Sequence, residues 1–142
     1  GETLTSHWQR HQRPPKYDAL MVAPERPRSD LYARIDARAD GLFASGVVEE
    51  VRRILASGVP VDAHALKAIG YRQVVEMLEG RCDLETAVEN TKRSSRHFAK
   101  RQLTWMRGLR EGSMHWVPPA EQGGVPATTN LWDQHTEGKR TS

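Results

Sequence analysis

Hydrophobic residues recur with helical spacing over most of the chain between residues 29 and 110. The first apolar stripe predicts a helix that begins at Ser29 or Asp30, both good N-cap residues, and that breaks near Gly46. A second stripe predicts a helix over residues 47–58, with Gly58 as its C-terminal stop. The apolar positions are Leu31, Ile35, Leu42 and Phe43 in the first helix, and Val47, Val51, Ile54 and Leu55 in the second.

A third helix is predicted from Asp62, a potential N-cap, to Gly80. Gly70 lies inside it, although glycine costs a helix interior about 1 kcal/mol relative to alanine. A glycine at such a position indicates the close approach of another helix or of a ligand. Tyr71 and its cationic neighbours Lys67 and Arg72 fit either a binding site or a core tyrosine beside surface charges.

The longest predicted helix begins at Asp83, with Thr86–Arg107 as its body. The run from Thr91 to Arg110 holds seven basic residues and no acidic one. At about 100° per residue, one face carries Arg93, Arg96, Lys100 and Arg107, and the opposite, packing face carries Leu84, Ala87, Thr91, Phe98, Trp105 and Leu109. A row of cations without acids suits a phosphate backbone, whereas an ordinary solvated face mixes both signs.

The two ends of the chain follow different patterns. Residues 1–15 predict a short polar helix, and residues 17–23 predict a buried strand of the kind found in parallel sheets. Residues 114–117 predict a short edge strand, and the polar residues 119–142 predict a disordered tail. We therefore expect a mainly α fold with one helical domain over residues 1–118.

Composition narrows the functional classes. The net charge of +3 is compatible with a nucleic-acid partner, and the single cysteine, Cys82, excludes an intrachain disulfide framework and fits a cytoplasmic protein. No apolar run approaches the roughly 18 residues of a membrane span. The sequence has no GxxxxGK[ST] or GxGxxG motif and no Ser or Cys paired in a motif with a His. The residues alone thus predict a helical RNA-binding module, and they do not indicate an enzyme.

Four segments, GETLT, LYARIDARADGLFASGVVEEVRRIL, ALKAIGYRQVVEMLEG and RHFAKRQLTWMR, occur in the order and spacing of a known family. They resemble the C-terminal half of bacterial tRNA dimethylallyltransferases, also called tRNA isopentenyltransferases. The resemblance implies a helical part of a nucleotide-binding P-loop α/β enzyme. It also implies magnesium-assisted transfer of a dimethylallyl group from dimethylallyl diphosphate to N6 of the adenosine 3′ of the anticodon, with that base flipped into a channel.

The same resemblance assigns roles to individual positions. It matches Arg38 to the arginine that contacts the substrate diphosphate, a sensible role for a guanidinium. It implies tRNA contacts at Asp62, Ala63, His64, Ala65, Leu66 and Lys67, and at Ser95, Arg96, His97, Phe98, Ala99, Lys100, Arg101 and Gln102. Further candidates are Arg34, Gly70, Tyr71, Arg72, Arg93, Trp105 and Arg107.

Three features of the family do not occur in the sequence: the phosphate loop, the Asp-Ser motif with the catalytic base, and the Gly-Gly-Thr segment. We therefore expect the chain alone to be inactive, and the magnesium ligands to lie outside it. Its expected partners are a tRNA anticodon stem-loop and dimethylallyl diphosphate. The chain is expected to be either a fragment of the enzyme or one half of a split enzyme, and in the second case a separate P-loop half is a further partner. The alternative is a stand-alone, non-catalytic helical RNA-binding module, and a purely structural role is the third reading.

Overall fold

A computed structural model describes residues 19–109 and 114–140 of the chain, with side chains up to residue 137. It divides the chain into two compact units. The helical unit is Arg26–Leu109, and the terminal unit combines Gly1–Glu25 with Arg110–Ser142. The polar helix predicted for residues 1–15 lies outside the described residues.

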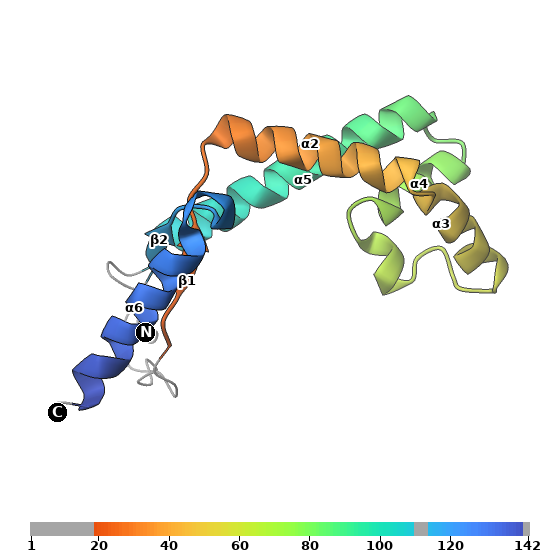
Figure 1. Cartoon of the computed structure of the whole chain (residues 1–142). Helices are drawn as coiled ribbons and strands as arrows, with labels where there is room; N and C mark the ends of the chain where they lie inside the picture. Colours follow the sequence, from red (N-terminus) through yellow and green to blue (C-terminus); the bar gives the residue numbers. More distant parts are fainter. Residues whose placement is uncertain (1–18, 110–113, 141–142) are drawn as a thin grey trace, which may run out of the picture. The chain divides into compact units, whose positions relative to one another are not determined.

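The helical unit contains four α-helices and a short 3-10 helix: α2 (Arg28–Ala44), α3 (Val47–Ala56), η1 (His64–Lys67), α4 (Tyr71–Leu78) and α5 (Leu84–Arg107). Figure 1 shows α2 and α5 side by side, and the two helices are in contact. The core of the unit consists of Val47, Val51, Leu66, Val74 and Val75. The apolar stripe predicted for the second helix is therefore confirmed at Val47 and Val51, which lie in this core.

The start of α2 differs from the prediction. Pro27 occupies the N-cap position with a φ of −54°, and the helix begins at Arg28. Asp30 therefore lies in the first turn, where its carboxylate accepts hydrogen bonds from Arg26 at 2.9 Å and from Arg34 at 3.2 Å. The predicted cap at Ser29 or Asp30 is wrong, because the fixed φ of proline lets a helix start directly after it.

The helix predicted from Asp62 to Gly80 is two elements, η1 and α4, and Asp62 does not cap either of them. Gly70 is the N-cap residue of α4 and has a φ of +98°, which side chains other than glycine rarely adopt. A Cβ at this position would lie 2.7 Å from Leu42 Cδ2. The predicted close approach is thus confirmed, and the partner is a side chain of α2.

Helix α5 begins and ends as predicted. The carboxylate of Asp83 caps it by accepting a 2.8 Å hydrogen bond from the backbone N–H of Thr86, and Gly108 follows its last residue. Ala87 and Thr91 are buried, but Leu84, Phe98 and Trp105 are exposed. The predicted packing face is wrong for those three residues. The eight-residue helix α4 contacts α5 but is too short to cover the whole face.

The terminal unit holds a two-stranded parallel sheet formed by β1 (Val22–Pro24) and β2 (His115–Val117). In its register Ala23 lies opposite Trp116, and the backbone N–H of His115 donates to the carbonyl of Met21 at 2.9 Å. Both predicted strands are confirmed, with β1 shorter and displaced toward Pro24. Tyr17 and Asp18, where the first strand was predicted to begin, lie outside the described residues.

The tail predicted to be disordered contains η2 (Ala120–Gln122) and a long helix, α6 (Gly124–Arg140), which contacts β2. The prediction of disorder is wrong for these residues. Pro126 lies in the first turn of α6, where its missing N–H breaks no helical hydrogen bond. The hydroxyls of Thr128 and Thr136 donate to carbonyls of the preceding turn, so polar residues are satisfied within the helix.

Candidate nucleic-acid interface

Helices α2 and α5 are joined by two ion pairs that run in antiparallel order. Arg96 Nη1 lies 2.6 Å from Asp36 Oδ1, and Lys92 Nζ lies 2.8 Å from Asp40 Oδ1. Lys92 also contacts Glu89 at 3.0 Å. The hydrogen bond that Lys92 donates to Asp40, followed by the one that it donates to Glu89, raises the pKa of Lys92 above its ordinary value. Two cations of the run from Thr91 to Arg110, one of them in the predicted basic row, are therefore neutralised within the protein.

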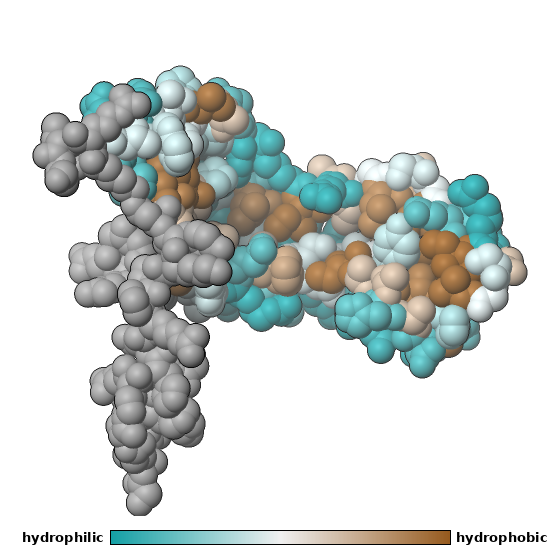
Figure 2. Space-filling view, turned by 90° about the horizontal axis from the view of Figure 1, so that it is seen from below, coloured by the Kyte–Doolittle hydropathy of each residue, from teal (hydrophilic) through white to brown (hydrophobic). Residues whose placement is uncertain are grey.

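The last turns of α5 present their cations differently. Lys100, Arg101 and Arg107 are exposed, and none of them forms an ion pair with another residue that the structure describes. The guanidinium of Arg101 lies 5.7 Å from the ring centre of Phe98. Phe98 is 46% exposed and Trp105 is 64% exposed. Figure 2 shows one face of the molecule, on which hydrophobic residues in brown lie among hydrophilic residues in teal.

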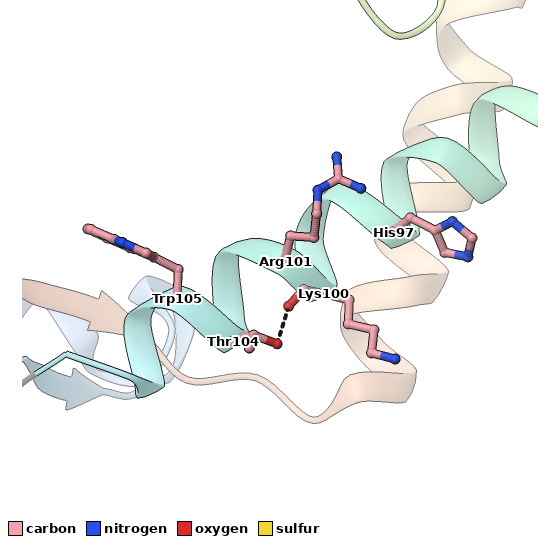
Figure 3. A pocket seen from close by; sticks show the side chains of 5 residues that line it. All are labelled: His97, Lys100, Arg101, Thr104 and Trp105. Atoms are coloured by element: carbon pink, nitrogen blue, oxygen red, sulfur yellow. Dashed lines mark hydrogen bonds between the residues drawn. The ribbon is translucent and has the colours of Figure 1, made fainter. Parts of the chain in front are cut away.

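A shallow depression of about 520 Å³ lies along this part of α5. Figure 3 shows the five side chains that line it, His97, Lys100, Arg101, Thr104 and Trp105, which come from successive turns. The hydroxyl of Thr104 donates to the carbonyl of Lys100 at 2.9 Å. Cations beside exposed aromatic rings are the groups that hold a phosphate backbone and stack unpaired bases.

The residues of the other predicted tRNA-contacting stretch, 62–67, differ in solvent exposure. Leu66 is 3% exposed and belongs to the core. Asp62, His64, Ala65 and Lys67 are exposed, and Ala63 is half-buried. A second depression of about 260 Å³ includes Asp62 and Lys67 in its lining. The exposed members can meet a ligand, whereas Leu66 serves to anchor η1.

Two of the candidate residues around Gly70 have contacts within the protein. The hydroxyl of Tyr71 donates to Glu50 Oε1 at 2.8 Å, and this hydrogen bond, with smaller effects of burial and of the negative charge, raises the pKa of Tyr71. Arg72 is exposed and lies 3.8 Å from Glu76. Gly70 itself is buried against Leu42. The motif AIGY therefore joins α2, α3 and α4.

Arg34 and Arg38 lie on the face of α2 opposite the carboxylates that bind α5, because each is two residues, or about 200°, away from Asp36. Arg38 is exposed and forms no ion pair with the described residues. Arg34 contacts Asp30, and Arg93 donates to Asn90 Oδ1 at 2.7 Å. Arg38 therefore lies on the face of α2 opposite the carboxylates that hold α5.

Sequence reasoning missed a buried polar link. Gln73 is 1% exposed and accepts a hydrogen bond from the backbone N–H of Gly70 at 2.8 Å. Its amide nitrogen donates to Ser94 Oγ at 3.3 Å. A glutamine three residues after an N-cap position is one half of a capping box, and this signal was present in the sequence.

Among residues 19–109 and 114–140, no three side chains of His, Cys, Asp or Glu lie together in a way that would hold a metal ion. Among the same residues, no helix combines the length and the apolar character needed to cross a bilayer.

Together these features define a mainly helical protein with a short parallel sheet and with exposed cations and aromatic rings at the end of one long helix. A family model described as IPP transferase matches residues 1–109. The chain belongs to the IPP transferase family.

The relatives reported for this chain are named tRNA dimethylallyltransferases. The chain is 50% identical over 109 residues to tRNA dimethylallyltransferase 1 of Trichlorobacter lovleyi, a match that covers 77% of this chain and 35% of the relative. It is 41% identical over 109 residues to tRNA dimethylallyltransferase of Thermomicrobium roseum, covering 77% and 32%. The chain thus spans about a third of the length of these curated relatives and corresponds to their C-terminal part.

Two solved structures resemble the fold. The full-length tRNA isopentenylpyrophosphate transferase from Bacillus halodurans gives a TM-score of 0.75 at 28% identity, over 86% of this chain and 41% of that one. The tRNA delta(2)-isopentenylpyrophosphate transferase from Staphylococcus epidermidis gives 0.74 at 31% identity, over 94% and 44%. The family resemblance and the mainly α fold class predicted from the sequence are confirmed.

Proposed function

We propose that the chain is the C-terminal, tRNA-holding part of a tRNA dimethylallyltransferase. The reaction is transfer of a dimethylallyl group from dimethylallyl diphosphate to N6 of the adenosine 3′ of the anticodon. The observation that supports this proposal is the exposed set Phe98, Lys100, Arg101, Trp105 and Arg107 on the last turns of α5. All five lie within the segment that the family model matches.

In this proposal the exposed cations of α5 neutralise phosphates of the anticodon stem-loop, and the aromatic rings stack on bases of the loop. The exposed residues of the stretch 62–67 provide a second contact, with Lys67 as its cation and His64 as a hydrogen-bonding group. Among residues 95–102, Arg96 is the exception, because its guanidinium is held by Asp36. The turns from His97 to Arg107 therefore bear most of the RNA contact.

We assign the diphosphate contact to Arg38. In the reaction the adenine amine attacks the allylic carbon, and the bond from that carbon to the diphosphate oxygen breaks. An exposed guanidinium stabilises the charge that grows on the departing diphosphate. The phosphate loop and the catalytic aspartate are supplied by a further part of the enzyme, whether in the same polypeptide or in a separate one. We assign the magnesium ligands to the same further part of the enzyme, since the described residues hold no cluster of three His, Cys, Asp or Glu side chains.

Titration of a tRNA anticodon stem-loop with the 142-residue chain at about 50 and 200 mM salt tests the binding proposal. We expect affinity to fall steeply as salt rises, because phosphate contacts release counterions. An affinity that does not depend on salt, or an absence of binding, overturns the proposal. Equal affinity for an unrelated RNA hairpin favours the stand-alone RNA-binding module instead.

Mixing the chain with a P-loop half from a relative tests the catalytic part of the proposal. We expect dimethylallylation of the tRNA only in the mixture, and we expect Arg38→Ala to reduce the rate without weakening tRNA binding. Dimethylallylation by the 142-residue chain alone contradicts the assignment of the base and the phosphate loop to another part of the enzyme.

A further inference from the structure

Gln73 is the largest fully buried side chain among the described residues, and it is polar. Burying an amide is costly unless its groups are hydrogen-bonded. Both ends of this amide have a partner: Oε1 accepts from the N–H of Gly70 at 2.8 Å, and Nε2 donates to Ser94 Oγ at 3.3 Å. A methionine would fill nearly the same space without any polar group. What distinguishes glutamine at this position is therefore the pair of hydrogen bonds that its amide forms with Gly70 and Ser94.

The two bonds lead to two different parts of the proposed RNA-binding surface. Gly70 closes the segment that carries the stretch 62–67, and its position is fixed by its φ of +98° and by its contact with Leu42. Ser94 lies on α5 and directly precedes the stretch 95–102. One side chain therefore bridges the end of the first stretch and the start of the second.

We propose that Gln73 is a positioning residue that fixes the separation of these two stretches, so that both meet one tRNA at the same time. This inference rests on the proposed function. Gln73 is 1% exposed, so it acts through Gly70 and Ser94 and does not touch the RNA. Holding both surfaces in place before binding lowers the cost of ordering them on the RNA.

Variants of Ser94 separate this role from helix capping. Ser94→Ala removes the link to α5 and leaves the bond from Gly70 to Gln73 intact. Ser94→Thr keeps a hydroxyl at the same place. Ser57→Ala is the matched control, since its hydroxyl bonds only a carbonyl of its own helix, that of Ile54 at 2.7 Å. Gln73→Met removes both bonds at nearly constant volume.

Each variant of the full chain is titrated with an anticodon stem-loop at several salt concentrations, and its urea midpoint is measured. We expect Ser94→Ala to weaken binding on the order of tenfold and to reduce the slope of log affinity against log salt by about 1, with a small change in the urea midpoint. Gln73→Met weakens binding and reduces the slope in the same way, and it also lowers the urea midpoint because the buried N–H of Gly70 loses its acceptor. Ser94→Thr and Ser57→Ala bind like the unmodified chain.

Unchanged affinity and slope in Ser94→Ala overturn the positioning role. A loss of affinity with an unchanged slope also overturns it, because both stretches then still reach their phosphates. If Ser94→Ala unfolds, the same two criteria are applied to Gln73→Met. Failure of the unmodified chain to bind overturns the proposed function, and the positioning role falls with it.

Discussion

The first and last parts of α5 both carry cations and use them differently. In the first part, up to Arg96, Ala87 and Thr91 are buried, and Lys92 and Arg96 bind carboxylates of α2. From His97 onward no described residue of the helix is buried, and Lys100, Arg101 and Arg107 face solvent beside Phe98 and Trp105. One continuous helix therefore stabilises the fold with one part and exposes cations and aromatic rings with the other.

This difference teaches that a count of cations overstates a binding surface. A cation that already holds a carboxylate has to give up that contact before it can bind a phosphate. The row predicted from the sequence contains four cations, Arg93, Arg96, Lys100 and Arg107, and the ion pair of Arg96 withdraws one of them. Arg101 lies outside that row, but it belongs to the exposed cations, and its guanidinium lies 5.7 Å from the ring centre of Phe98.

The largest expected effect comes from removing the exposed cations. We expect the triple variant Lys100→Ala, Arg101→Ala, Arg107→Ala to lose tRNA affinity on the order of 100-fold near physiological salt, and to reduce the salt slope by about 2–3. Stability should change little, since these side chains are exposed. Fluorescence titration measures both quantities. The charge-matched control is Arg52→Ala, Arg53→Ala, Arg81→Ala, and an equal loss in that variant would show that only net charge matters.

The next effect concerns stability. Ala87 is completely buried, so Ala87→Leu overpacks the first part of α5 and should cost about 1–3 kcal/mol of unfolding free energy. Trp105→Ala, in the exposed part, should change the unfolding free energy by less than about 0.5 kcal/mol. Urea denaturation followed by circular dichroism measures both. A larger loss for Trp105→Ala than for Ala87→Leu would reverse the comparison.

The sequence was sufficient to predict α5, because an aspartate cap, helical periodicity and the absence of proline act locally. It was not sufficient to predict where the packing face ends. Phe98 and Trp105 continue the periodicity of Ala87 and Thr91, but coverage depends on the length of α4, which is not encoded in α5. The pairing of Asp36 with Arg96 joins residues 60 positions apart, and only the fold brings them together.

The same limit explains the other corrections. Gly70 was recognised as a site of close approach, but its φ of +98° and its contact with Leu42, from a distant segment, become visible only in the folded structure. Helix α6 was missed because threonine and glycine favour irregular structure on average, whereas contact with β2 favours the helix here. The roles of the site residues were implied by resemblance, and they remain predictions for the experiments above.

The next prediction concerns Arg96, a cation of the first part of α5 that is held by a carboxylate of α2. Asp36→Asn removes the carboxylate that holds Arg96, so the guanidinium becomes available to RNA. We expect tRNA affinity to rise by less than about tenfold and the salt slope to increase by about 1. Asp133→Asn, in α6, makes the same change in net charge and is the control. An unchanged slope in Asp36→Asn would mean that Arg96 cannot reach the RNA even when released.

The smallest effect is the dependence of stability on pH through the cap of α5. The hydrogen bonds from Thr86 hold the pKa of Asp83 below its ordinary value of 3.8. Because the pKa is lower in the folded state, the contribution of this carboxylate to stability is fully present above about pH 4. It is lost as the pH falls through the folded-state value.

Asp83→Asn isolates this contribution, because asparagine also caps helices but does not titrate. We expect Asp83→Asn and the unmodified chain to have similar urea midpoints at pH 7. As the pH falls below about 4, the unmodified chain should lose more stability than the variant. Trp105→Ala, which leaves the cap intact, should follow the unmodified chain. If the urea midpoints of Asp83→Asn and of the unmodified chain fell equally with pH, the charge of Asp83 would not contribute to the stability of the protein.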